Sequence, residues 1–123
     1  MPLSRLLKSE YGASRMKKYS VVLDNDAEDD LFDIYRFVAL NDSFEQADSL
    51  FQTLKSACHS PGSFPLRGHF PPELHDVGIT EFREIIRKPY RILYSIEGSI
   101  VIIHCLLDGR RDMQTLLQER LLR

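Results

Sequence analysis

Six basic side chains in the last third of the chain are the residues best suited to chemistry. They are Arg83, Arg87, Lys88, Arg91, Arg110 and Arg111. Guanidinium groups pair with phosphate oxygens and stack on aromatic rings, and Tyr90 and Tyr94 stand near Arg91 in the sequence. These residues could therefore form a surface for an anionic partner. The alternative is that they form salt bridges to the acids at positions 84, 108 and 112, and both interpretations stand at this point.

Residue types that bind metals are present but poorly spaced. In the acidic run 24–30, Asp29 and Tyr35 occupy the sixth and twelfth positions, where a calcium-binding EF-hand loop needs Gly and Glu. The four histidines and two cysteines match no zinc motif, and His104 and Cys105 are expected on opposite faces of one strand. Phosphate-binding glycine loops and nucleophile elbows are absent as well. We therefore expect no metal and no cofactor.

Charge is distributed unevenly along the chain. The net charge is only −2, but residues 24–48 hold nine acids and one base, whereas residues 83–123 hold eight bases and five acids. Such a division favours a surface for a partner on the basic part of the chain. The acidic part has a simpler explanation, because acids at the start of a helix complement the helix dipole.

Length and composition indicate one domain. A chain of 123 residues with 43% hydrophobic residues can bury a core without disulfides. Its longest apolar run, residues 100–107, is too short to cross a membrane, no signal peptide is recognisable, and two cysteines suit a reducing compartment. We expect a cytoplasmic protein with an N-terminal extension at residues 1–16 and a domain at residues 17–123.

The first half of the domain predicts a strand and a helical hairpin. A strand is expected at 19–23 and a helix at 26–40, followed by a second helix capped by Ser43 with Gln46 and ended by Pro61. Apolar residues recur at helical spacing and are expected to be buried: Leu31, Ile34, Tyr35, Val38, Phe44, Ala47, Phe51, Leu54 and Cys58.

The second half predicts a long, proline-rich loop at 60–78 and then three strands at 80–87, 90–96 and 100–107. A short helix carrying Met113, Leu116, Leu117 and Leu121 ends the chain. The order β-α-α-β-β-β-α is typical of an α+β domain with a small antiparallel sheet. In such a meander Arg91 would lie close to Arg110 and Arg111, with Arg91 and Arg111 exposed to solvent.

Three sequence motifs carry a resemblance to a known family. They are Phe-Arg-Glu-Ile-Ile at 82–86, Pro-Tyr-Arg-Ile-Leu-Tyr at 89–94 and Asp-Gly-Arg-Arg-Asp at 108–112. Over residues 17–122 the chain resembles the RelE/ParE toxins of bacterial type II toxin–antitoxin modules, and the last two motifs look most like the ParE-type plasmid stabilisation branch. The resemblance implies a helical hairpin on a β-meander, and growth inhibition that a cognate antitoxin neutralises.

The resemblance implies three alternative functions. ParE-type toxins inhibit DNA gyrase and need no catalytic residues. RelE-type toxins are mRNA interferases, metal-independent endoribonucleases that act in the ribosome. In that case Arg91 and Arg111, with Arg83 as a third candidate, would stabilise charge on the phosphate. A third alternative is a non-toxic homologue that only binds an antitoxin.

One departure from the RelE pattern favours the gyrase alternative. The stretch 113–121, where RelE-type toxins carry a proton-transfer group, has Leu116 and Leu117 and no Tyr or His. His75 and Tyr94 could transfer protons but lie outside the family motifs. The expected partners are therefore an antitoxin and either gyrase or the ribosome with mRNA. A homodimer and a toxin–antitoxin hetero-oligomer both stay open.

Overall fold

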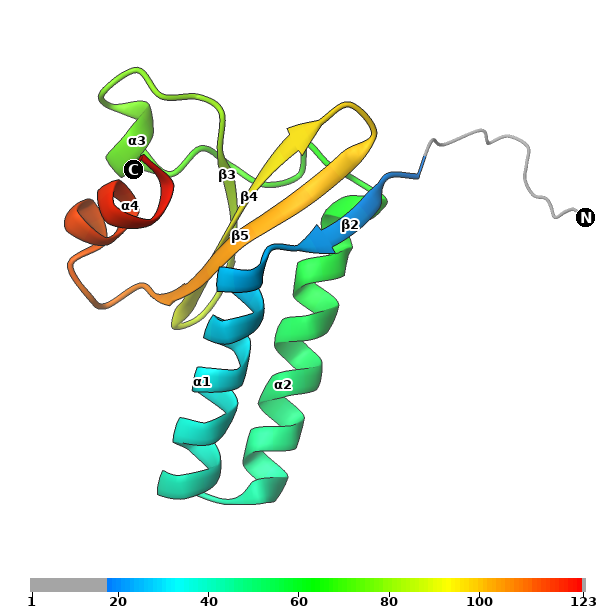
Figure 1. Cartoon of the computed structure of the whole chain (residues 1–123), viewed down its shortest axis with the longest axis vertical. Helices are drawn as coiled ribbons and strands as arrows, with labels where there is room; N and C mark the ends of the chain where they lie inside the picture. Colours follow the sequence, from blue (N-terminus) through cyan, green and yellow to red (C-terminus); the bar gives the residue numbers. More distant parts are fainter. Residues whose placement is uncertain (1–17, 123) are drawn as a thin grey trace, which may run out of the picture.

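The computed structural model describes residues 18–122. The predicted extension at residues 1–16 lies outside the described residues. Figure 1 shows a twisted sheet from which two long helices project on one side, while two short helices pack together at another corner. In the described part of the chain, no helix is both long and apolar enough to cross a membrane.

The hairpin forms as its sequence signals predict. Strand β2 (Ser20–Leu23) leads into α1 (Asn25–Asn41), and α2 (Phe44–His59) returns beside it. The Asp24 side chain accepts a hydrogen bond from the amide of Asp26 at the start of α1. At the start of α2 the Ser43 hydroxyl accepts one from the amide of Gln46. Both caps satisfy amides that the first helical turn leaves without partners.

The sheet is a meander with one additional strand. Strands β3 (Arg83–Arg87), β4 (Tyr90–Glu97) and β5 (Ile100–Asp108) are antiparallel, as predicted. The strand order is β2-β5-β4-β3, and β2 pairs with β5 in parallel, so the sheet is mixed and not wholly antiparallel. Because β5 is central, it is covered on both faces, which explains its continuous apolar sequence.

The long loop between α2 and β3 contains structure that its sequence did not predict. A 3-10 turn, η1 (Ser60–Gly62), follows α2 directly, and a single helical turn, α3 (Pro72–His75), comes later. The C-terminal helix α4 (Met113–Leu121) lies against α3 in Figure 1. Helices α3 and α4 cover the face of the sheet opposite to the hairpin, whereas η1 packs beside β2.

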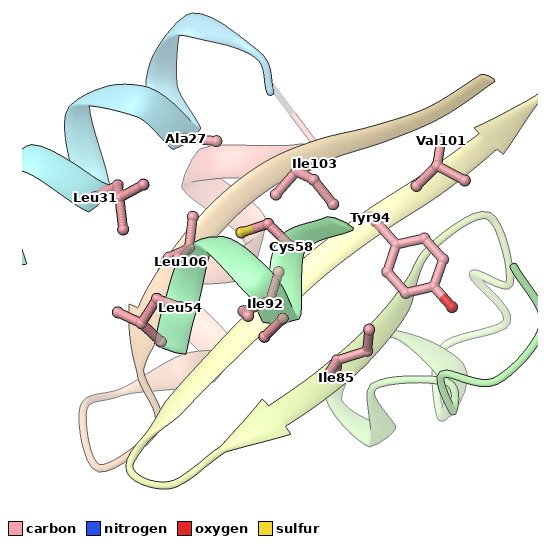
Figure 2. Packing of buried hydrophobic residues seen from close by; sticks show 11 residues of the cluster. Ala27, Leu31, Leu54, Cys58, Ile85, Ile92, Tyr94, Val101, Ile103 and Leu106 are labelled. Carbon is pink, nitrogen blue, oxygen red and sulfur yellow. The ribbon is translucent and has the colours of Figure 1, made fainter. Parts of the chain in front are cut away.

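A larger apolar core fills the space between the hairpin and the sheet (Figure 2). Leu54 and Cys58 of α2 pack against Ile92 of β4 and Ile103 of β5, all with no exposed surface. Tyr94 lies at one margin of this core, and Figure 2 shows its hydroxyl directed away from the other labelled residues. Alternate residues of β4 therefore face the hairpin, as predicted.

A smaller core lies on the other face. Leu93 of β4 and Cys105 of β5 contact Met113 and Leu117 of α4, and all four side chains are buried. The C-terminal helix therefore packs on the sheet of its own chain, as its apolar spacing predicts.

Two sequence expectations about burial were wrong. Phe44 was expected in the core but is 72% exposed, because it lies at the tip of the hairpin, beyond the reach of the sheet. His104 and Cys105 were expected on opposite faces of β5. The register of β5 against β4 shifts between Leu93 and Tyr94, so a bulge places both side chains on the face of the smaller core, where His104 contacts Phe82.

Candidate functional site

The predicted site is assembled where β4 begins and β5 ends. Tyr90 pairs with Asp108, and the Gly109 amide donates a hydrogen bond to the Pro89 carbonyl at 2.8 Å. A Cβ atom on Gly109 would lie only 2.8 Å from Cδ of Arg91, so glycine lets this loop lie directly on the arginine. The two family motifs that carry Tyr90 and Gly109 are therefore in contact, as the meander predicts.

Arg91 is held by two carboxylates. Its Nε donates to Glu84 at 2.6 Å, and its Nη1 and Nη2 donate to the two oxygens of Glu73 at 2.8 and 2.7 Å. Glu84 comes from the neighbouring strand β3 and Glu73 from the short helix α3. This bidentate pair, with a second carboxylate on Nε, uses three of the five N–H groups of the guanidinium group.

The expectation that Arg91 is exposed was wrong. Its side chain is 12% exposed, and those of Glu84 and Glu73 are 2% and 21% exposed. Hydrogen bonds from Arg91 lower the pKa of Glu73, and the same hydrogen bonds raise the pKa of Arg91. The salt-bridge interpretation therefore describes Arg91, and the network fastens α3 to the sheet.

His69 extends this network to the surface. Its Nε2 lies 2.8 Å from the second oxygen of Glu84, and the two residues also form a backbone bridge. The His69 side chain is 57% exposed, whereas Glu84 is buried. Neither Glu73 nor His69 was a sequence candidate, because both lie in the irregular loop, where no periodicity signals which residue meets Arg91.

Arg83 contacts the loop at residues 66–70 from the face of the sheet that the hairpin covers. Its Nη1 donates to the Gly68 carbonyl at 2.8 Å, and its guanidinium carbon lies 4.5 Å from the centre of the Phe70 ring. Arg83 and Arg91 are thus separated: Arg91 reaches α3, and Arg83 holds the chain at residues 66–70.

The remaining basic side chains differ in their partners. Arg110 forms a salt bridge with Asp108 at 2.6 Å, and this contact lowers the pKa of Asp108 to about 2. Arg87 borders a depression beside α2, on the hairpin side of the sheet, and its Nη1 donates to a backbone carbonyl. Within residues 18–122 the Lys88 and Arg111 side chains make no hydrogen bond or ion pair, and both are exposed.

The two alternative proton-transfer groups differ in exposure: Tyr94 is buried, whereas His75 is exposed. Tyr94 is fully buried, its hydroxyl donates to the Pro65 carbonyl at 2.7 Å and accepts from the Gly68 amide at 3.0 Å, and burial raises its pKa. A Cβ on Gly68 would lie 2.6 Å from that hydroxyl, so this contact requires glycine. The His75 ring stacks on Phe70 with centroids 5.4 Å apart.

One further polar cluster surrounds His104. Its Nε2 lies 2.7 Å from the Ser95 hydroxyl, and its Nδ1 lies 3.9 Å from a carboxylate oxygen of Asp24. Burial lowers the pKa of His104 and so favours its neutral form. Ser95 is 8% exposed, so its hydroxyl is not presented to a substrate. Among residues 18–122, no group of three or more metal-ligating side chains could hold an ion.

Comparison with known proteins assigns this arrangement to a family. The model of the family described as the ParE toxin of the type II toxin–antitoxin system, parDE, matches residues 21–113. Toxin ParE3 from Caulobacter vibrioides (strain ATCC 19089 / CIP 103742 / CB 15) is 29% identical over 91 residues, which cover 74% of this chain and 87% of that toxin.

Two solved structures share the fold. The chromosomal ParDE toxin–antitoxin system from P. aeruginosa aligns with a TM-score of 0.61 at 17% identity, covering 73% of this chain and 95% of that one. The toxin–antitoxin complex RelBE2 from Mycobacterium tuberculosis aligns with a TM-score of 0.56 at 18% identity, covering 76% of this chain and 93% of that one.

Proposed function

Because the chain belongs to the ParE toxin family of type II toxin–antitoxin systems, we propose that it arrests bacterial growth by inhibiting DNA gyrase. The main alternative is cleavage of mRNA in the ribosome, as in RelE-type toxins. The fold is common to both types of toxin, so the distinction depends on the side chains.

The carboxylates around Arg91 are the observation that carries this proposal. A metal-independent nuclease needs cations that are free to neutralise the charge developing on a phosphate. Here three of the five N–H groups of the Arg91 guanidinium already donate to Glu84 and Glu73, and the side chain is nearly buried. A phosphate at Arg91 would therefore lie beside two carboxylates, which oppose its binding.

The C-terminal helix supports the same conclusion. Leu117 is fully buried in the smaller core, and Leu116 and Leu121 pack at its margin. Residues 113–121 carry no histidine or tyrosine. Helix α4 therefore offers no histidine or tyrosine to protonate a leaving oxygen, which agrees with inhibition of a protein target.

We assign contact with the target to Arg111 and Lys88, with Arg110 and Arg87 at the margins. Among residues 18–122, the exposed side chains of Arg111 and Lys88 make no hydrogen bond or ion pair, so they can bind acidic groups at little desolvation cost. The pKa of Asp108, which Arg110 lowers most, is lowered further by the charge of Arg111, so Arg111 lies close to Asp108. Arg91 and Arg83 are then positioning residues: Arg91 holds α3, and Arg83 holds the loop at residues 66–70.

The proposal includes a cognate antitoxin. The two solved structures described above are parts of toxin–antitoxin systems, and ParE3 is named as a toxin. A protein that inhibits an essential enzyme in its own host must be neutralised. We therefore expect a hetero-oligomer with an antitoxin to be the form in which the protein is stored in the cytoplasm.

Induced expression in a bacterial host tests the proposal directly. Growth, plasmid supercoiling and transcript integrity are measured in the same culture. Growth arrest with relaxed or cleaved DNA and intact transcripts is the expected result. Transcripts cut at ribosome-bound positions would show that the protein cleaves mRNA instead of inhibiting gyrase. Unimpaired growth would identify a non-toxic homologue.

A pair of variants tests the assigned surface. Arg111→Glu should abolish growth arrest, because it reverses an exposed charge at the assigned surface. Arg36→Glu is the matched control: Arg36 is also exposed, on α1, and pairs only with Asp33. Equal toxicity of the two variants would contradict the assignment of Arg111.

A further inference from the structure

A pocket lies at the end of the sheet where β4 turns into β5, on the face that the hairpin covers. It has a volume of about 770 Å³ and is lined by residues 63–67 of the loop after η1, by Tyr19 before β2 and by Ile96 of β4. The Tyr19 amide donates to the Gly62 carbonyl at 2.8 Å, so η1 closes the outer side of β2 here. Figure 1 shows this end of the sheet on the right, away from α4 on the left. A volume of this size is sufficient for a ligand.

The loop that forms one wall of the pocket is held in place by the sheet. The Tyr94 hydroxyl donates to the Pro65 carbonyl at 2.7 Å and accepts from the Gly68 amide at 3.0 Å. From the neighbouring strand, Nη1 of Arg83 donates to the Gly68 carbonyl at 2.8 Å. The wall therefore has its shape before a ligand arrives, which reduces the entropy that binding costs.

Large apolar side chains are exposed around the pocket. Phe64 is 55% exposed and Leu66 is 68% exposed, although the loop that carries them is fixed. Ile96 and Pro65 are half-buried at the floor and wall. Apolar side chains gathered around a hollow on a monomer are typical of a site that a partner covers.

One cation borders this apolar lining. Arg67 is exposed, and among residues 18–122 its side chain makes no hydrogen bond or ion pair. Burial raises the pKa of Tyr94, and the charge of Arg67 is one of those that lower it, so the guanidinium group lies near the Tyr94 hydroxyl. No carboxylate lines the pocket. Glu97 follows Ile96 but lines the hollow around His104.

We propose that this pocket binds an acidic peptide segment of another protein. One large apolar side chain of that segment packs between Leu66 and Ile96, and a neighbouring carboxylate pairs with Arg67. The combination follows from charge complementarity, because an apolar lining with an unpaired cation at its rim attracts an apolar group beside an acid. Lys88 and Arg111 lie at the opposite end of the sheet, so this site does not depend on the proposed function.

A peptide titration of the isotope-labelled, full-length protein, followed by NMR, tests this inference. The probe is the peptide acetyl-Glu-Asp-Phe-Glu-Asp-amide. We expect the amides of Phe64, Leu66 and Arg67 to shift, with a Kd of about 1 mM or tighter. The same peptide with serine in place of phenylalanine should bind at least about tenfold more weakly. Equal binding of the two peptides, or no shift of these amides, would overturn the proposal.

Two variants with matched controls separate the apolar and the charged contact. Arg67→Glu and Leu66→Ser should each weaken binding of the phenylalanine peptide at least about tenfold. Arg36→Glu and Leu40→Ser are the controls, because both residues are exposed on α1, and they should keep the native Kd. All four side chains are on the surface, so the variants should fold. Native affinity in Arg67→Glu or Leu66→Ser would contradict the assigned contacts.

The alternative occupant is a second copy of this chain. In that case the amides of Phe64 and Leu66 would shift with protein concentration in the absence of peptide, and sedimentation would show a dimer. We expect neither effect, because the surface of a second copy has no place in the proposed site. Concentration-dependent shifts that Leu66→Ser abolishes would assign the pocket to self-association and overturn the proposal.

Discussion

The two faces of the sheet are stabilised in different ways. The face beneath the hairpin is an apolar core in which Leu54, Ile92 and Ile103 have no exposed surface. The opposite face combines a smaller apolar core with the charged network of Arg91, Glu84 and Glu73. Hydrophobic burial stabilises the first face at any pH, whereas the second depends on charges that must remain paired.

Under the proposed function, this difference assigns Arg91 to the shape of the fold and leaves the contact with the target to other cations. An arginine that could bind phosphate is used here to fasten α3 to the sheet. The cations that remain available lie at the margin, on Lys88 and Arg111. If the proposed assignment is correct, mutations can separate folding from target binding, because folding would depend on Arg91 and binding on Arg111.

Breaking the charged network should have the largest effect. Arg91→Glu leaves Glu84 buried beside a like charge, and we expect it to lower the free energy of unfolding by about 3–5 kcal/mol or more. Urea denaturation of the variant and the native protein measures this. A variant as stable as the native protein would show that the network contributes nothing to folding.

Truncating one leucine in each core compares the two faces directly. Leu54 and Leu117 are both fully buried, one beneath the hairpin and one in α4. Leu54→Ala and Leu117→Ala should each cost about 2–5 kcal/mol, because each leaves a cavity. Thermal unfolding measures both, and a cost below about 1 kcal/mol for Leu117→Ala would indicate that α4 is held by a partner and not by its own sheet.

Acid should destabilise the charged face. Hydrogen bonds from Arg91 hold the pKa of Glu73 below its ordinary value of 4.5. Folding thus favours the ionised form of Glu73. Its contribution to the free energy of unfolding is fully present above pH 4.5 and is lost as the pH falls through the lowered pKa. Glu73→Gln should weaken the protein by about 1–3 kcal/mol at neutral pH and reduce this loss in acid.

The measurement is the free energy of unfolding between pH 7 and about pH 3 for both proteins. Leu54→Ala is the control, since it removes no titrating group and should keep the pH dependence of the native protein. Parallel curves for Glu73→Gln and the native protein would show that Glu73 does not contribute to the pH dependence.

Reversing the exposed charge should have the smallest effect on stability. Arg111 has no ion pair among residues 18–122, so Arg111→Glu should change the free energy of unfolding by no more than about 0.5 kcal/mol. The contrast with Arg91→Glu sharpens the assignment of the two arginines. A cost as large as that of Arg91→Glu would place Arg111 in a structural role.

Much of the fold could be predicted because its signals are local. The Ser43 cap, the alternation of Ile92 and Tyr94 and the apolar run of β5 depend only on neighbouring residues. The meeting of the Tyr90 end of β4 with the Gly109 end of β5 also followed, because two short turns leave a meander little choice of register.

The sequence by itself determined the order of the four strands and the three longer helices, the family and the set of basic residues. Only the tertiary structure decided which of these residues are free. Both carboxylates that bind Arg91 precede it in the chain, Glu84 by seven residues and Glu73 by eighteen. Strand pairing places Glu84 beside Arg91, whereas Glu73 is brought there by the short helix α3 within a long loop. Charge pairing over such separations depends on the path of the whole chain, and no local pattern records it.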